Sequence, residues 1–268
     1  MTRQLSILFV GDVVGGIGRR ALTALLPSLR ERYQPDFVVV NGENAAGGIG
    51  ITPKTADELF DAGVDVITLG NHTYRHREIY NYLDQKERIL RPANFLRSQP
   101  GHGACVVEHD GVRLGVVNLS GNLYLRAGRS AFTEIEAALG DLGTVDHILV
   151  DIHAEATSEK VAMGWHLDGR VTAVVGTHTH VPTADARVLP RGTAYITDVG
   201  MTGPRGGVIG VKREQAIESL LTQMPVRFET SDDDPWLMGV LIRCSQPLRA
   251  DSIEQVMMPR PSPPESGR

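Results

Sequence analysis

The chain has 268 residues and a formal net charge of −5, with 41% hydrophobic and 22% charged residues. This length and composition indicate a globular protein with a sizeable core. We expect one domain over residues 1–258 and a flexible tail at 259–268. The negative charge gives no basic field for double-stranded nucleic acid, so we expect none as a partner.

The chain lacks an apolar run as long as a membrane span, and its N-terminus lacks the pattern of a secretory signal. We therefore expect a cytoplasmic protein without a membrane partner. Cys105 and Cys244 lie in apolar, strand-like runs. Buried, reduced thiols are the common state of such residues in a reducing compartment, so we assign them no chemistry.

Short apolar runs alternate with amphipathic segments in the first half of the chain. Strands are predicted at 5–10, 36–41 and 64–71, with helices at 20–33 and 52–63 between them. Thr52 is the predicted N-cap of the second helix, with Pro53 at its first position and Gly63 beyond its end. This alternation is typical of βαβ units and a parallel sheet.

Antiparallel pairing is predicted in the middle of the chain, where two apolar runs within 104–120 are joined by Asp110 and Gly111. Both residues tolerate positive φ, which is a strong signal for a hairpin. Later patterns predict strands at 147–153, 171–178, 193–200 and 236–245, and helices at 156–165 and 213–223. The order predicts an α/β fold in which helices flank a pair of mixed sheets.

Side chains that can bind metal occur repeatedly where a predicted strand ends, the edge at which open α/β sheets bind ligands. They are Asp12, Glu43, Asn44, Asn71, His72, His153, His178 and His180. Any one of them alone is more often a turn former, a helix cap or a core residue with its hydrogen bonds made. Together, carboxylate, amide and imidazole donors at five strand ends predict a metal centre.

The donor types restrict the metal. Oxygen and nitrogen donors without thiolates disfavour a structural zinc site and suit Fe, Mn, Zn or Co in an open catalytic site. Two metals about 3.5–4 Å apart would need a bridging carboxylate, for which Glu43 is the candidate. Such a pair clamps the attacking and leaving oxygens of an in-line phosphoryl displacement.

The motif order Gly-Asp, Gly-Glu-Asn, Gly-Asn-His, His and Gly-x-His-x-His resembles the calcineurin-like metallophosphoesterases. The particular residues in these motifs are similar to those of the YmdB-type bacterial branch. The resemblance covers nearly the whole chain, including YQPDFVVVNGENAAGG and TDVGMTGPRGGVIG. It implies a four-layer α-β-β-α sandwich with two mixed β-sheets and a di-metal site on the strand-end loops. Two departures from the common form of that fold are Val14, where a ligand His is expected, and Glu43, where a bridging Asp is expected.

The resemblance implies that Asp12, Glu43 and His180 hold the first metal, with Asn44 supplying the donor that Val14 cannot. Glu43 would bridge, and the second metal would be held by Asn71, His153 and His178. An amide oxygen is a harder ligand, in the hard–soft acid–base sense, than the imidazole that it replaces in the first site. This favours Fe or Mn, with Zn as the further option.

His72 resembles the proton donor of that family. A metal-bridging hydroxide would attack phosphorus, and the departing alkoxide would be protonated by His72. The alternative role for His72 is a hydrogen bond to a metal ligand.

Weaker candidates follow from two neighbouring segments. Tyr74, Arg75 and His76 are candidates for contacts with a base or phosphate, although loop residues of this kind are more often solvated. In the glycine-rich segment after residue 197, Asp198 is a candidate partner of a ligand histidine and Arg205 a candidate substrate contact. An ordinary turn is the alternative there.

The function that we predict is a di-metal phosphodiesterase, and the resemblance alone implies cyclic nucleotides, either 2',3'- or 3',5'-cyclic monophosphates, as its small-molecule partners. A phosphomonoesterase or nucleotidase is the second interpretation, because the same metal centre serves both ester types. The third is a metal-containing nucleotide-binding signalling protein with incidental catalysis. We expect a homo-oligomer only because most soluble oligomers are symmetric assemblies of one chain.

Overall fold

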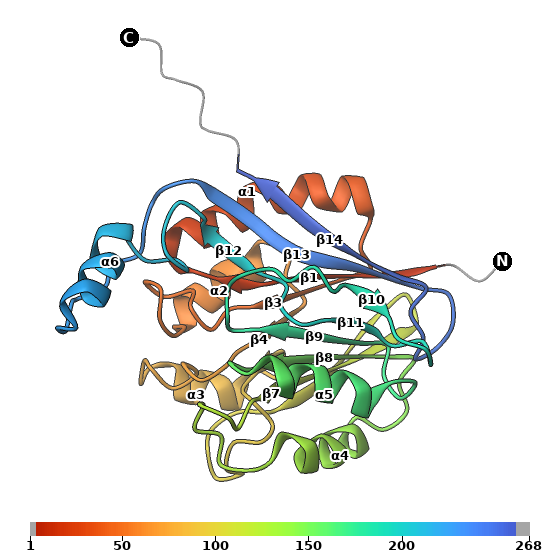
Figure 1. Ribbon diagram of the computed structural model, residues 1–268. Helices are drawn as coiled ribbons and strands as arrows, with labels where there is room; N and C mark the ends of the chain where they lie inside the picture. The colour runs from red at the N-terminus through yellow and green to blue at the C-terminus, as the bar shows by residue number, and fades with distance from the viewer. Residues whose placement is uncertain (1–3, 261–268) are drawn as a thin grey trace.

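Two mixed β-sheets lie face to face between two layers of helices in the computed structural model, which describes residues 4–260 (Figure 1). The predicted α-β-β-α sandwich is therefore confirmed. Residues 261–268, most of the predicted tail, lie outside the described residues, and Pro259 is the last residue of a strand.

The first sheet has the strand order β2-β12-β13-β1-β3-β4-β5, with β14 also paired to β13. β1, β3, β4 and β5 are parallel, whereas β13 pairs antiparallel with β1, β12 and β14. The strands of this sheet are β1 (Leu5–Val10), β2 (Asp12–Val13), β3 (Phe37–Asn41), β4 (Val66–Thr68), β5 (Ile89–Leu90), β12 (Met201–Pro204), β13 (Pro235–Cys244) and β14 (Ser252–Pro259).

The second sheet has the order β10-β11-β9-β8-β7-β6. Its central strands are parallel, and β6 and β10 add antiparallel edges. The strands are β6 (Ala104–His109), β7 (Val112–Ser120), β8 (His147–His153), β9 (Ala173–Thr177), β10 (Arg187–Val188) and β11 (Ala194–Ile196).

Each sheet has its own helices. α1 (Gly15–Tyr33), α2 (Pro53–Asp61) and α3 (Ile79–Gln85) pack on the outer face of the first sheet, and α4 (Ala131–Asp141) and α5 (Thr157–Leu167) on that of the second. α6 (Arg213–Thr222) projects away from the sheets (Figure 1). No helix among residues 4–260 combines the length and apolar character needed to cross a membrane.

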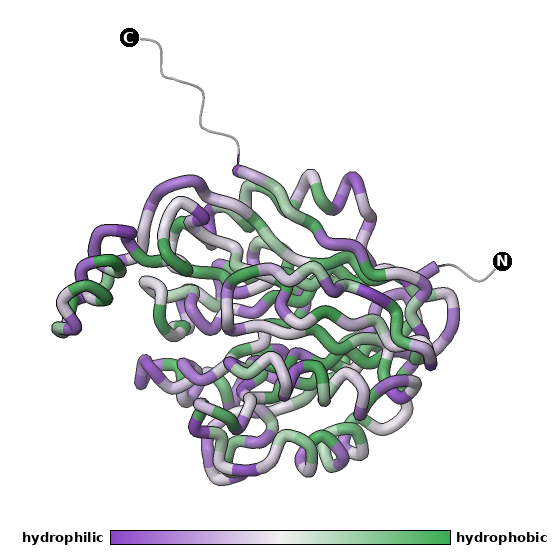
Figure 2. The backbone as a smooth tube through the Cα atoms, viewed as in Figure 1, coloured by the Kyte–Doolittle hydropathy of each residue, from purple (hydrophilic) through white to green (hydrophobic). Residues whose placement is uncertain are grey.

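The period of two along each strand divides its side chains between two apolar layers. In β1, Leu8 and Val10 pack in the layer beneath α1 and α2, whereas Ile7 and Phe9 pack between the two sheets. Both faces are covered, so the central strands are largely apolar, and hydrophobic segments run through the middle of the molecule (Figure 2).

The predicted hairpin turn and the predicted helix N-cap are both present. Asp110 and Gly111 have φ of 49° and 77° and join β6 to β7 as a hairpin. Thr52 caps α2 and exchanges hydrogen bonds with Thr55 in a capping box.

Other elements differ from the prediction. α1 begins at Gly15, five residues earlier than predicted, since its first turn is rich in glycine, a poor helix former that the sequence pattern did not mark as helical. A Cβ at Gly18 would lie 2.3 Å from the carbonyl oxygen of Thr202, so this close approach requires glycine. The helices α3 and α4 and the strand β14 have no counterpart in the prediction.

We expect Leu26→Ala to lower the free energy of unfolding by about 2–5 kcal/mol, because Leu26 is fully buried between α1 and the first sheet and the truncation leaves a cavity. Thr23→Ala, at an exposed position of the same helix, is the control and should change it by less than about 0.5 kcal/mol. Urea unfolding measures both. Equal effects would contradict the packing described for α1.

Candidate metal centre

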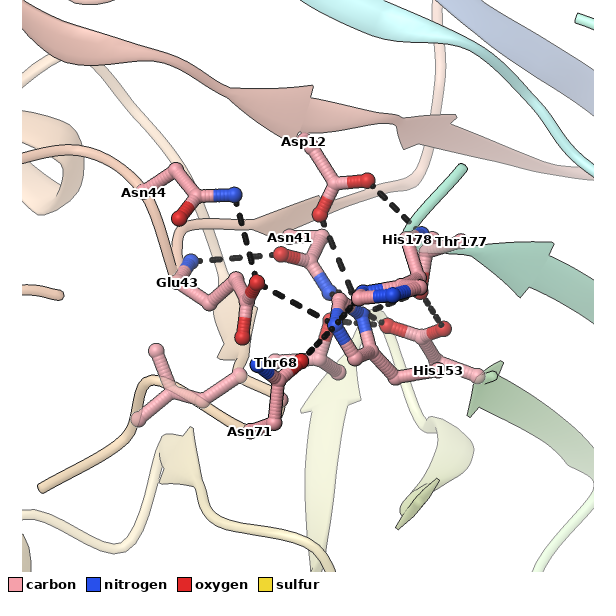
Figure 3. Close-up of polar contacts among 12 residues, drawn as sticks. Asp12, Asn41, Glu43, Asn44, Thr68, Asn71, His153, Thr177 and His178 are labelled. Atoms are coloured by element: carbon pink, nitrogen blue, oxygen red, sulfur yellow. Dashed lines mark hydrogen bonds and ion pairs between the residues drawn. The ribbon is translucent and has the colours of Figure 1, made fainter. Parts of the chain in front are cut away.

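Strand ends from both sheets bring the predicted donors to one site. Asp12 begins β2, one residue beyond the end of β1, and Glu43 and Asn44 follow β3. Asn71 and His72 follow β4. From the second sheet, His153 ends β8, and His178 and His180 follow β9. Figure 3 shows the side chains of Asp12, Glu43 and Asn71 directed toward His153 and His178.

One group of donors surrounds His153. Its Nε2 lies 3.0 Å from both Asn71 Oδ1 and His178 Nδ1, and 3.1 Å from Glu43 Oε1. Atoms of Glu43, His153 and His178 that could bind a metal ion all lie within 4.8 Å of one another. Asn71 Oδ1 and Glu43 Oε1 are acceptors only, and His153 Nε2 can donate at most one proton, so the group holds more lone pairs than protons. A cation would satisfy them.

A second group surrounds His180. Its Nε2 lies 3.3 Å from Asn44 Nδ2 and 3.8 Å from Asp12 Oδ2, and Asn44 Nδ2 lies 3.2 Å from Glu43 Oε1. The Asn44 amide thus presents its nitrogen to these neighbours and its oxygen to His72. Ligation by its oxygen requires the amide to turn over.

Glu43 is common to the two groups. Its Oε1 contacts both His153 and Asn44, and its Oε2 accepts a hydrogen bond from the backbone N–H of His72 at 3.0 Å. Burial alone would raise the pKa of this carboxyl, but His153 and His72 outweigh burial and hold the pKa well below its usual value. Glu43 is thus a buried carboxylate in contact with both donor groups, and it could be shared by metal ions bound at them.

The outer nitrogen of each histidine has an oxygen partner that fixes its tautomer. His153 Nδ1 lies 2.9 Å from Thr177 Oγ1, His178 Nε2 lies 3.0 Å from Glu155 Oε2, and His180 Nδ1 lies 2.8 Å from the carbonyl oxygen of Ile209. Thr177 already donates to Asp151, so it accepts the proton of His153. With these outer nitrogens protonated, the lone pairs face the cluster, as ligation requires.

A buried network beneath His153 was not predicted from the sequence. The Asp151 carboxylate is fully buried and accepts hydrogen bonds from Asn41 Nδ2, Thr68 Oγ1 and Thr177 Oγ1 at 3.0, 2.6 and 2.7 Å. Burial raises the pKa of Asp151 to about 6. A carboxylate inside the apolar run HILVDIH, two residues before a ligand, was the signal available for this group.

The buried carboxylates of Asp12 and Glu43 need a positive charge nearby. Among residues 4–260, Asp12 Oδ1 is a buried atom without a hydrogen-bond partner. Burial opposes a charge on His153, but Glu43 and Asp12 prevail and raise its pKa to about 9. In the metal-free protein a proton on His153 therefore supplies the charge that the carboxylates require. Buried donors, an orphaned oxygen and oriented lone pairs fit bound metal ions.

The loop that carries His178 and His180 is strained. These residues have φ of 98° and 65°, and Ile209, whose carbonyl oxygen is the partner of His180, has φ of 44°. Each such residue costs about 1–3 kcal/mol unless its surroundings impose the conformation. The backbone N–H of His178 is held by Asp12 Oδ2 at 2.9 Å. Function at this loop is the common reason for such strain.

A cleft of about 270 Å³ opens onto the donors, and His72 lines it. His72 Nδ1 lies 2.9 Å from Asn44 Oδ1 and 3.1 Å from Glu43 Oε1. The ring is thus fixed through Nδ1, and Nε2 is the nitrogen that remains to exchange a proton with a ligand.

The four weaker substrate candidates do not line this cleft. Tyr74 donates to the carbonyl oxygen of Pro100 and packs on Tyr80, and burial raises its pKa to about 12. His76 Nε2 contacts the carbonyl oxygen of Ile49, and Arg75 beside it is exposed.

Arg205 and Asp198 have partners outside the cleft. The guanidinium of Arg205 lies 4.4 Å from the ring centre of Trp236, away from the cleft lining. The Asp198 carboxylate bonds Thr179 and Lys160, so its link to His178 and His180 runs through the intervening Thr179 backbone.

Comparison with known proteins gives consistent results. The family described as YmdB-like protein matches residues 8–256. A Bacillus subtilis protein named 2',3'-cyclic-nucleotide 2'-phosphodiesterase is 45% identical over 95% of this chain and 97% of its own.

Two crystal structures are similar over almost their whole length. A hypothetical protein from Thermus thermophilus superimposes with a TM-score of 0.90 at 39% identity, covering 96% of this chain and 100% of its own. A structure described as a novel phosphatase from Mycoplasma pneumoniae gives a TM-score of 0.91 at 36% identity, covering 98% and 96%.

We expect Thr177→Val to weaken metal binding by about 10- to 100-fold, because it removes the oxygen that orients the His153 ring. Thr172→Val is the matched control, since Thr172 is a buried threonine that contacts His147 Nδ1 at 3.2 Å, outside the cluster. Titration of metal-free protein with Mn²⁺ measures both affinities. Equal losses in the two variants would contradict the role of Thr177.

Proposed function

The chain belongs to the YmdB-like protein family, and from this membership and the donor cluster we propose that it is a metal-dependent phosphodiesterase of cyclic nucleotides. The observation that carries the proposal is the convergence of donor atoms of Glu43, His153 and His178 within 4.8 Å, beside Asp12 Oδ1, a buried atom without a hydrogen-bond partner among residues 4–260. A site for hydrolysis without metal has no need for this surplus of buried lone pairs.

The two donor groups support two metal sites that share Glu43. The group around His180 includes Asp12 and Asn44, and the group around His153 includes Asn71 and His178. Oxygen donors and imidazoles without thiolate favour Fe or Mn, with Zn as the further option. When bound, the metal ions polarise the phosphoryl oxygens and make water nucleophilic at neutral pH.

Hydrolysis forms a bond between a water oxygen and phosphorus and breaks the bond between phosphorus and one ribose oxygen. That oxygen leaves as an alkoxide, a poor leaving group unless it is protonated. His72 lines the cleft and is fixed through Nδ1, so we assign the proton transfer to its Nε2. Glu43 and Asn44 hold the ring in place for this step.

The cyclic substrate rests on the relative from Bacillus subtilis, whose name specifies 2',3'-cyclic nucleotides. The cleft volume of about 270 Å³ is just below the roughly 300–1,000 Å³ of small-molecule sites, which favours a mononucleotide over a longer nucleic acid. Both 2',3'- and 3',5'-cyclic monophosphates meet this description. The cytoplasmic location and the homo-oligomer stay predictions.

The first test compares hydrolysis of bis(p-nitrophenyl) phosphate and p-nitrophenyl phosphate by the Mn-loaded protein. We expect turnover of the diester, and we expect Asp12→Asn to abolish it because the variant lacks a buried carboxylate of the cluster. Asp61→Asn, at an exposed position of α2, is the control and should keep the activity. A panel of 2',3'- and 3',5'-cyclic nucleotides then identifies the substrate.

Other outcomes support the alternative interpretations. Turnover of the monoester alone would favour a phosphomonoesterase. Tight binding of cyclic nucleotides without turnover would favour a signalling protein that binds nucleotides.

We expect His72→Ala to slow hydrolysis of a cyclic nucleotide by about 10²- to 10⁴-fold, because the alkoxide loses its proton donor. Bis(p-nitrophenyl) phosphate should be affected far less, since nitrophenolate leaves without protonation. His109→Ala, an exposed residue of β6 outside the cleft, is the control. Steady-state kinetics on both substrates checks this, and an equal loss on both would argue against a proton-donor role.

A further inference from the structure

A buried lysine outside the donor cluster is joined to the loop that carries two of the proposed ligands. Lys160 extends from α5, which packs against β9 (Figure 1). Its Nζ lies 2.8 Å from Asp198 Oδ2, and both side chains are 0% exposed. Asp198 is the only carboxylate among residues 4–260 within 4.0 Å of this ammonium.

The backbone beside Lys160 is shaped to admit its side chain. A Cβ at Gly176 would lie 2.9 Å from Lys160 Cδ and 1.8 Å from the carbonyl oxygen of Thr197. Only glycine allows the aliphatic stem and the backbone of residue 197 to approach β9 this closely. Burial of an ammonium is costly unless it is paired and hydrogen-bonded, and Asp198 and Thr179 supply these partners.

Asp198 connects Lys160 to the loop that contains His178, Thr179 and His180. Its Oδ2 accepts hydrogen bonds from Thr179 N and Thr179 Oγ1 at 3.1 and 2.6 Å, and its Oδ1 accepts one from Gly200 N at 2.9 Å. Lys160 Nζ also lies 3.4 Å from Thr179 Oγ1. The backbone and side chain of Thr179 are therefore held by the buried ion pair of Lys160 and Asp198.

Thr179 is the residue between His178 and His180, which both adopt positive φ. Neither imidazole can keep its direction if the peptide groups at Thr179 rotate. We propose that Lys160 and Asp198 are positioning residues that fix the directions of the His178 and His180 rings and so set the metal affinity of the centre. This inference rests on metal binding by these histidines in the proposed function.

The two members of the pair have different tasks. Asp198 holds the loop, and Lys160 supplies the charge that lets a carboxylate remain there, away from water. Neither residue lines the cleft, so neither contacts the substrate. Their effect is therefore on the metal ligands.

The test uses Lys160→Met, Asp198→Asn and the double variant, each prepared without metal. Titration with Mn²⁺ gives the affinity, the visible spectrum of the Co²⁺-loaded protein reports the ligand geometry, and thermal unfolding of the metal-free protein reports stability. Lys54→Met, at an exposed position of α2, is the control for loss of a lysine charge.

We expect each single variant to bind Mn²⁺ about 10- to 100-fold more weakly and to change the Co²⁺ spectrum. The double variant leaves no unpaired buried charge, so its unfolding temperature should recover toward that of the unaltered protein. Its metal affinity should stay low, because a neutral amide holds Thr179 less firmly. Lys54→Met should leave the affinity and the spectrum unchanged.

If the variants lose stability but keep the Mn²⁺ affinity within about twofold and the Co²⁺ spectrum unaltered, the pair is only structural and the inference is wrong. The same holds if the double variant regains stability and affinity together. If the single variants do not fold, the double variant alone decides. Failure of the unaltered protein to bind Mn²⁺ or Co²⁺ would instead overturn the proposed function along with the inference.

Discussion

Two buried carboxylates, Asp12 and Glu43, require a positive charge at the edge where the two sheets meet. Neither has an arginine or lysine partner among residues 4–260, and imidazoles are their cationic neighbours. Burial makes an uncompensated charge costly, so a proton on His153 or a bound metal ion must accompany them. The surrounding structure serves this requirement: it places further donors on strand ends and keeps basic side chains away from them.

In the sandwich, both sheets contribute donors to this site. Glu43 and Asn71 follow parallel strands of the first sheet, whereas His153 and His178 come from parallel strands of the second. Tight approach of the two sets depends on missing side chains. A Cβ at Gly70 would lie 2.3 Å from both Glu43 Oε2 and His153 Nε2. Any larger residue there would separate the two sheets at the point where their donors meet.

Around this site, polar groups beside the donors hold the imidazole rings in place. Thr177 and Asp151 fix the tautomer of His153, and the carbonyl oxygen of Ile209 does the same for His180. The loop of His178 and His180 adopts a backbone conformation that local preferences oppose. Its backbone N–H groups at His178 and Thr179 donate hydrogen bonds to the Asp12 and Asp198 carboxylates, which hold it. Buried polar contacts thus offset local strain and keep the lone pairs oriented.

By itself, the sequence predicted an α/β fold in which helices flank a pair of mixed sheets, because short apolar runs and the Asp110-Gly111 turn are local patterns. The four-layer sandwich followed from the resemblance of the motifs, and polar residues at strand ends predicted a shared metal centre. The sequence did not predict α3, α4 or β14, or the network of Asp151 and Lys160. Only the tertiary structure decided which donors surround His153, which surround His180, and that Tyr74 contacts Pro100 and Arg205 contacts Trp236. The physical reason is that side-chain direction at a strand end follows from packing and hydrogen bonds between segments far apart in the chain, which no local pattern records.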